Sequence, residues 1–312
     1  MERVHLAAAL LTIAAACTTE PETPCELCTQ PPSTLFVIDR SASAIVRYDG
    51  VTGVYRDVFA AGAAAGLDRP SSVRLGPTGH VFLAGFGRGD VTRYDLASGT
   101  NMGVFYGDTN LLEEPVELMF QGDQLVVLGK DTHNLVVLDS NGNVIESVGG
   151  PDLRAAHDFV LDGDLAYVGT DTHPQLGTTI QVWSLATGAL VRQFGTIDQL
   201  ASATGVALGP DGQLYVCDGQ RDQVLVLDAL SGVLTDILVP AESGLLKTPI
   251  SLDFGPDGAL YVLDAAGLHR LNPHTGDQLS LFVDARDGHL VGPRSFTFLT
   301  EDAIDDAIAR TR

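Results

Sequence analysis

Short apolar runs that end on a small or polar residue recur along the chain at regular intervals. Six of them share one pattern, four apolar residues followed by Asp or Gly: Leu35–Asp39, Val81–Gly85, Leu125–Gly129, Leu165–Gly169, Leu214–Asp218 and Leu260–Asp264. Runs of this length are typical of buried β-strands. Their spacing of roughly 40 to 50 residues predicts a repeat that holds four strands per unit.

A second strand-like segment follows each of these runs and ends on Asp, Ser or Asn. The six copies are Ile45–Asp49, Val91–Asp95, Leu135–Asp139, Ile180–Ser184, Val224–Asp228 and Leu268–Asn272. A Gly comes three or four residues later in every copy. Because such side chains bond the backbone just ahead and Gly supplies a positive φ, the pattern predicts a hairpin turn. Calcium binding by the six oxygen-bearing side chains is the alternative, but the turn explains all six at once.

A third kind of segment precedes the first and ends in a turn that contains Gly. Five copies lie within the chain: Ser72–Gly79, Glu117–Gly122, Asp158–Gly163, Gly205–Gly212 and Ser251–Gly258. The chain reaches Leu35 without such a segment, and the sixth copy, Arg294–Thr300, lies at the far end. One unit would therefore combine three strands from the N-terminus with an inner strand from the C-terminus. This arrangement closes the ring of sheets and leaves no open edge between the first and last units.

The prediction is an all-β fold, a six-bladed β-propeller with four-stranded blades over residues 34–300. Residues 301–312 form a tail with room for a short helix. The 34 Gly and 15 Pro suit a fold with many turns, and the 45% hydrophobic residues suffice for a large core.

The repeats resemble a known family. The segment Pro210–Asp218 (P-D-G-Q-L-Y-V-C-D), followed by Val224–Asp228 (V-L-V-L-D), resembles the NHL repeat. It is also similar to repeats of the streptogramin-lyase-like and SMP-30/gluconolactonase-like propellers. The resemblance covers Leu35–Thr300 and implies the architecture, whereas such folds serve scaffolds, binders, hydrolases and lyases alike.

The N-terminus has the pattern of a signal peptide at residues 1–16. Arg3 precedes an uncharged run from Leu6 to Ala16, which as a helix spans about 16 Å and is too short to cross a hydrocarbon core of roughly 30 Å. The sequence Ala14-Ala15-Ala16-Cys17 resembles the lipobox of bacterial lipoproteins, which implies a lipid on Cys17. Ala14-x-Ala16 also suits an ordinary signal peptidase, which would leave Cys17 free.

The following residues, 17–33, are rich in Pro, Thr and Glu and predict a disordered tether. Cys25 and Cys28 form a C-x-x-C pair in it. Neither the βαβ setting of a redox motif nor a second C-x-x-C for zinc is present, so a local disulfide in an oxidising compartment is the preferred interpretation. Cys217 lies alone in an apolar strand, where a packed thiol is expected.

Charge restricts the partners. The formal net charge is −22, from 18 Lys and Arg against 40 Asp and Glu, and no basic run occurs. Nucleic acid is therefore excluded as a partner, because phosphate binding needs a basic footprint. We expect an exported protein that is a monomer and touches the membrane only through its lipid, in the periplasm or at the cell surface; secretion without an anchor is the alternative.

Inner strands of a propeller line its central channel, which selects two rings of candidate positions. The first ring is Ser71, Val116, His157, Thr204, Ile250 and Arg294. The second is Ser72, Glu117, Asp158, Gly205, Ser251 and Ser295. Glu117, His157 and Asp158 are the strong ligands or proton carriers among them, and Arg294 is their countercharge. They predict a site for a small polar ligand, or for Ca²⁺ or Mg²⁺ on Glu117 and Asp158, unless these groups are merely solvated or paired with Arg294.

Two copies of Asp-Thr-His, Asp131–His133 and Asp171–His173, resemble a metal pair. They occupy the same place in adjacent repeats, so common ancestry explains them. The family resemblance offers a sharper comparison, since SMP-30-like lactonases hold a divalent cation with Glu, Asn and Asp. The matching strands here carry Glu117 and Asp158 but no Asn.

The sequence leaves three functions open. The first is a non-enzymatic module at the cell envelope that binds a protein, a glycan or a small molecule. The second is a metal-dependent hydrolase or lyase of the SMP-30 or streptogramin-lyase type, with its site at the channel mouth. The third is a purely structural envelope protein.

Overall fold

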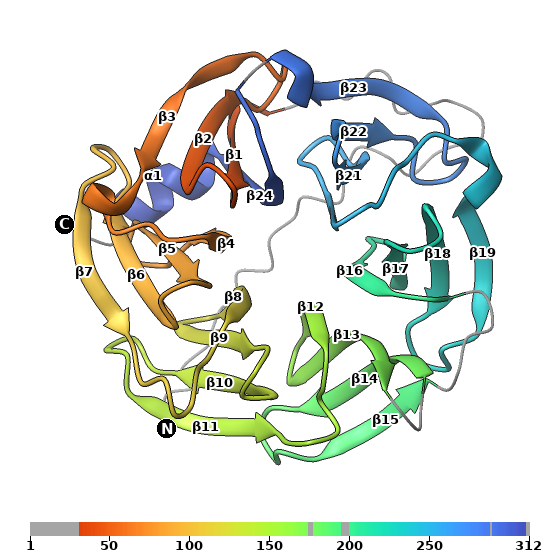
Figure 1. Cartoon of the computed structure of the whole chain (residues 1–312), viewed down its shortest axis with the longest axis horizontal. Coiled ribbons are helices and arrows are strands. Elements are labelled where there is room, and N and C mark those ends of the chain that lie inside the picture. Colours follow the sequence, from red (N-terminus) through yellow and green to blue (C-terminus); the bar gives the residue numbers. More distant parts are fainter. Residues whose placement is uncertain (1–30, 174–176, 195–199, 288, 310–312) are drawn as a thin grey trace, which may run out of the picture.

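The computed structural model describes residues 31–173, 177–194, 200–287 and 289–309. In these ranges the strands form six antiparallel sheets of four strands each, arranged as blades around a central axis, where the sequence predicts the channel (Figure 1). The predicted six-bladed propeller is confirmed. Cys17, Cys25 and Cys28 lie outside the described residues, so the lipid and the disulfide stay predictions.

The blades run from an inner strand at the channel to an outer strand at the rim. Blade 1 contains β24 (Pro293–Thr300), β1 (Ser33–Asp39), β2 (Ala44–Asp49) and β3 (Tyr55–Ala61). Blade 2 contains β4 (Pro70–Leu75), β5 (His80–Gly85), β6 (Asp90–Asp95) and β7 (Asn101–Tyr106). Blade 3 contains β8 (Pro115–Gln121), β9 (Gln124–Gly129), β10 (Asn134–Leu138) and β11 (Val144–Gly149).

The remaining three blades repeat this order. Blade 4 contains β12 (Ala156–Asp162), β13 (Leu165–His173), β14 (Gly177–Ser184) and β15 (Leu190–Phe194). Blade 5 contains β16 (Ala203–Leu208), β17 (Gln213–Asp218), β18 (Gln223–Asp228) and β19 (Leu234–Val239). Blade 6 contains β20 (Ser251–Phe254), β21 (Leu260–Asp264), β22 (Gly267–Leu271) and β23 (Gln278–Asp284).

Closure of the ring follows the prediction. Strand β24 pairs antiparallel with β1, with Val37 opposite Phe296 and Leu35 opposite Phe298. The C-terminal α1 (Glu301–Ala309) follows β24 directly, and the Glu301 N–H donates to the carbonyl of Pro32 at 3.1 Å. The two ends of the described chain therefore meet at one point of the ring.

Apolar side chains fill the spaces between neighbouring blades. At the closing junction, the ring of Tyr261 from blade 6 lies 4.8 Å from Phe298 and 5.2 Å from Phe282, both in edge contacts. Such pairs add specific geometry to the area that they bury. Cys217 is fully buried between blades 5 and 6, and burial raises the pKa of its thiol. The expectation of a packed thiol is confirmed.

The turns between third and outer strands are built as the sequence predicts. The carboxylate of Asp49 accepts N–H bonds from Val51 at 3.1 Å and Thr52 at 2.9 Å, and Asp228 accepts that of Ser231 at 2.7 Å. The glycines that follow have positive φ, as at Gly53 (71°) and Gly188 (67°). These side chains close turns, so the calcium alternative for the six positions is not needed.

Antiparallel blades give the ring two different faces. The turn face holds the loops that follow inner and third strands, which are residues 50–54, 76–79, 96–100, 122–123, 139–143, 163–164, 185–189, 209–212, 229–233, 255–259 and 272–277. The crossover face holds the opposite loops, which are residues 40–43, 62–69, 86–89, 107–114, 130–133, 150–155, 200–202, 219–222, 240–250, 265–266, 285–287 and 289–292. Helix α1 and Pro32 lie at the turn face, because inner strands end there.

Two equivalent turn glycines allow a test of how the blades meet. A Cβ added at Gly53 would collide with the carbonyl oxygen of Phe282 in blade 6, whereas one at Gly188 meets no atom within 4 Å. Gly188→Ala should cost only the strain of positive φ, about 1 kcal/mol. Gly53→Ala should cost about 3 kcal/mol or more, because a blade must also shift. Urea unfolding of both variants measures this difference, and equal losses would contradict it.

Candidate functional site

The predicted second ring of channel positions exists as a set of equivalent places on the inner strands. Its members pair with equivalent residues of the next strand out: Ser72 with Ala84, Glu117 with Leu128, Asp158 with Gly169, Gly205 with Cys217, Ser251 with Leu263 and Ser295 with Ile38. In the register, Ser71, Val116, His157, Thr204 and Arg294 are skipped as bulged residues. A bulge re-aims its side chain, so both candidate rings can contribute to one channel mouth.

Glu117 is almost fully buried, and three protein donors surround one of its carboxylate oxygens. Its Oε1 accepts the hydroxyl of Ser72 from the neighbouring blade and the backbone N–H of Leu118 at 3.0 Å. The same oxygen lies 3.1 Å from Nη2 of Arg74. The carboxylate thus links blades 2 and 3 across the channel wall.

Asp158 lies at the same level in blade 4. Its Oδ1 accepts the N–H of Phe159 at 2.9 Å, and its Oδ2 accepts the N–H of Val206 in blade 5 at 3.0 Å. Burial and the nearby charge of Glu117 raise the pKa of this carboxyl well above its ordinary value, against the opposing effect of Arg294 and Arg74. The site therefore contains a carboxyl group that holds its proton more tightly than an exposed Asp.

Arg74 and Asp253 complete the charged channel and were not among the sequence candidates. Each lies two residues after a second-ring position, so strand alternation directs both toward the channel. Arg74 bonds the carbonyls of Val73 at 2.9 Å and Phe296 at 3.5 Å, besides its contact with Glu117. Burial raises the pKa of Asp253, which Arg74 partly offsets. The sequence could have identified both residues, because side chains two positions apart on a strand lie on the same face and Ser72 and Ser251 were already channel candidates.

Arg294 spans the channel mouth. From blade 1 it donates to the carbonyl of Ile250 in blade 6 and to that of His157 in blade 4, each at 3.4 Å. Burial lowers the pKa of Arg294, whereas Asp158 and Glu117 raise it. Arg294 is thus coupled electrostatically to both acids, but its hydrogen bonds within the described residues join it to backbone carbonyls, so its role as their countercharge stays a prediction.

His157 pairs with a different acid, Asp171. Its Nε2 lies 2.5 Å from Oδ2 of Asp171, and Ser202 donates its hydroxyl to the other oxygen of Asp171. Although burial opposes the shift, these hydrogen bonds hold the pKa of Asp171 below its ordinary value. The sequence singled out Asp171 as part of a repeated Asp-Thr-His but did not connect it to His157, which is the bulged residue of β12 beside the paired strand β13 that carries Asp171.

These contacts fit a divalent cation poorly. One oxygen of Glu117 and both oxygens of Asp158 already accept bonds from the protein, and two guanidinium groups share the channel with them. Among the described residues no group of three or more His, Cys, Asp and Glu is placed to hold a metal. The cation on Glu117 and Asp158 stays a prediction. Metal analysis of the intact protein beside a Glu117→Ala/Asp158→Ala variant decides it.

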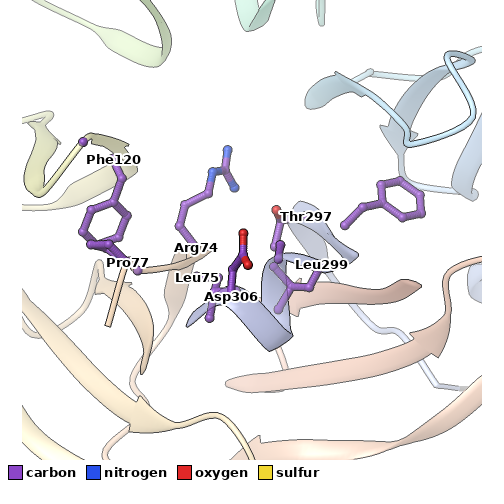
Figure 2. A pocket seen from close by; sticks show the side chains of 11 residues that line it. Arg74, Leu75, Pro77, Phe120, Thr297, Leu299 and Asp306 are labelled. Carbon is purple, nitrogen blue, oxygen red and sulfur yellow. The ribbon is translucent and has the colours of Figure 1, made fainter. Parts of the chain in front are cut away.

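The opposite mouth of the channel, at the turn face, opens into a cavity of about 470 Å³. Figure 2 shows Arg74, Thr297 and Asp306 directed toward this opening, with Phe120 and Leu299 beside them. Asp306 belongs to α1, so the helix forms one side of the cavity. Arg74 therefore links the charged level of the channel to this second mouth.

Comparison with known proteins supports the architecture. Neither a protein-family model nor a curated protein matches this chain. A chain in the solved structure titled "Crystal structure of Nidogen/Laminin Complex" is similar over 85% of this chain and 97% of its own length, with a TM-score of 0.68 and 14% sequence identity. At this identity the likeness shows the fold alone. Separately, no helix among the described residues is long and apolar enough to cross a membrane.

The raised pKa of Asp158 predicts how stability depends on pH. The folded protein keeps the proton that the unfolded chain loses above its ordinary pKa of 3.8, so stability should fall as the pH rises above that value. Asp158→Asn removes this titration and should make the decline in unfolding free energy above pH 3.8 shallower, while Asp253, whose pKa burial also raises, still contributes to the decline.

The matched control is Asp139→Asn, at an exposed turn where hydrogen bonds from Asn143 and Asn141 lower the pKa. Its stabilisation is lost only as the pH falls below 3.8, so the slope between pH 5 and pH 8 should stay unchanged. Urea unfolding at several pH values measures both slopes. An unchanged slope in the Asp158 variant would contradict the assignment.

Proposed function

We propose that this protein is exported, anchored to a membrane by a lipid on Cys17, and binds another protein through its crossover face. The observation that carries the proposal is the contact between Glu301 and Pro32, which puts the start of the described chain at the turn face. A tether from Cys17 therefore joins the propeller on the turn face. The crossover face and the channel mouth with Arg294 and His157 are left directed away from the anchor.

The two faces also differ in the charge of their loops. The loops of the turn face contain neither Lys nor Arg, and α1 adds Glu301, Asp302, Asp305 and Asp306. The loops of the crossover face carry Arg40, Arg69, Arg88, Lys130, Arg154, Arg221, Lys247 and Arg286 beside their acids. Anionic headgroups repel an acidic face, so the turn face would be held off the membrane surface at the end of its tether. A mixed-charge face offers the complementary pairs that set specificity between proteins.

The structural comparison agrees with this proposal. The similar chain belongs to a structure whose title describes a complex of nidogen and laminin. A propeller of this size therefore occurs in a protein assembly. Loops on a rigid scaffold are a common place for such binding.

The anchor is tested by replacing one cysteine at a time. With Cys17→Ala the exported protein should leave the membrane fraction for the soluble fraction, because the acylated residue is gone. Cys25→Ala lies in the same segment and should stay membrane-bound. Fractionation followed by mass spectrometry of the mature N-terminus gives both results. Membrane retention of the Cys17 variant would contradict the anchor.

The binding face is tested by site-specific photo-crosslinking in the intact envelope. A crosslinking residue at Asp131, which is exposed on the crossover face, should give a discrete adduct with a partner. The same residue at Leu230, which is 71% exposed on the turn face, should give none. Adducts from Leu230 alone, or equal adducts from both positions, would overturn the proposed orientation.

A further inference from the structure

One corner of the crossover face gathers arginines against a single aromatic ring. Arg40 follows β1, Arg69 precedes β4, and Phe86 lies in the turn after β5. The guanidinium carbon of Arg40 lies 4.2 Å from the centre of the Phe86 ring, and that of Arg69 lies 5.3 Å from it. A ring face holds a guanidinium group in place while leaving its in-plane N–H donors available.

The donors of Arg40 are poorly satisfied. Its Nε reaches the carbonyl of Pro70 only at 3.5 Å. Its Nη2 is buried and has no hydrogen-bond partner among the described residues. A buried donor without a partner is rare in folded proteins, because it has lost its water without gaining an acceptor.

The charge at this corner is also unbalanced. Burial, Arg294 and Arg69 lower the pKa of Arg40 to about 9, and Glu114 opposes them. Arg69 has a loose, exposed ion pair with Asp68 at 3.7 Å. Arg40 has no ion pair within 4.0 Å among the described residues, and Arg294 bonds only backbone carbonyls there. Asp158 and Glu117 offset part of the charge of Arg294, so the uncompensated positive charge of this corner lies on Arg40, in a chain whose net charge is −22.

We infer that Arg40 and Arg294 form a binding site for a small oxyanion, a carboxylate or a phosphate group, at the crossover-face mouth of the channel. Phe86 orients Arg40, and Arg69 adds charge at the rim. A guanidinium fork donates two parallel N–H bonds to either kind of oxyanion. The inference rests on the proposed function only for the source of the anion, since a partner protein would supply an Asp, Glu or C-terminal carboxylate.

Thermal unfolding of the exported protein tests the site with small anions. Acetate and phosphate are titrated separately at constant ionic strength, with sodium chloride as the balancing salt. We expect the melting temperature to rise and saturate with at least one of them. Saturation with acetate alone identifies a carboxylate site, and saturation with phosphate alone identifies a phosphate site.

Single substitutions test whether the anion response arises at Arg40. Arg40→Gln should weaken the apparent affinity by about tenfold or more, and Arg40→Lys, which keeps the charge but loses the fork, by less. The matched control is Arg286→Gln on the same face, where an exposed arginine is already paired with Asp284 at 2.6 Å, and it should respond like the intact protein.

Two results would overturn the inference: no saturation with either anion, or equal saturation in the intact protein and both Arg40 variants. If the crosslinking residue at Asp131 gave no adduct while the anion response was observed, the result would count against the proposed partner and not against this site. The two failures are therefore distinguishable.

Discussion

The antiparallel pairing of β24 with β1 is the interaction on which the rest of the structure depends. It joins residues from the two ends of the chain, so blade 1 exists only when the ring is closed. It also fixes the ends, because β24 continues into α1 beside Pro32 at the turn face. The same junction builds part of the opposite face. Asp39 accepts the N–H groups of Val291 at 2.5 Å and Gly292 at 3.1 Å, which holds the start of β24 against the end of β1.

Arg40 and Arg294 owe their proximity to this closure. Arg40 is the residue after β1, and its N–H donates to the carbonyl of Gly292 at 2.9 Å. Arg294 is the bulged residue just inside β24. Two guanidinium groups that repel each other are thus brought together by a backbone arrangement that the fold needs in any case. An acidic ligand that relieved the repulsion would also bind only the closed ring, which couples ligand binding to the integrity of blade 1.

Much of this architecture could be predicted from the sequence, because strands, turns and ring closure follow from local patterns repeated six times. The contacts between side chains in the channel were harder to predict. Glu117 and Asp158 were found by aligning repeats, but their bonds to Ser72 and to Val206 come from neighbouring blades and depend on blade geometry. His157 was expected beside Glu117 and Asp158, yet the bulge in β12 places it next to Asp171 of the paired strand β13. Arg40 and Arg69 lie in connections that vary between repeats, so no alignment of strands could select them.

The distribution of charge argues for separate roles of the two faces. A net charge of −22 spread over the surface gives no specificity, since it attracts any cation and repels any anion. A compact cationic corner against that background is different, because an anion must come close enough to contact Arg40 and Arg294 before attraction exceeds the general repulsion. The proposed site would therefore exclude most acidic molecules and would favour a partner that presents one oxyanion at the right place on a complementary surface. If the proposed binding takes place, the acidic surface and the arginine corner together would make the crossover face selective, which neither would achieve alone.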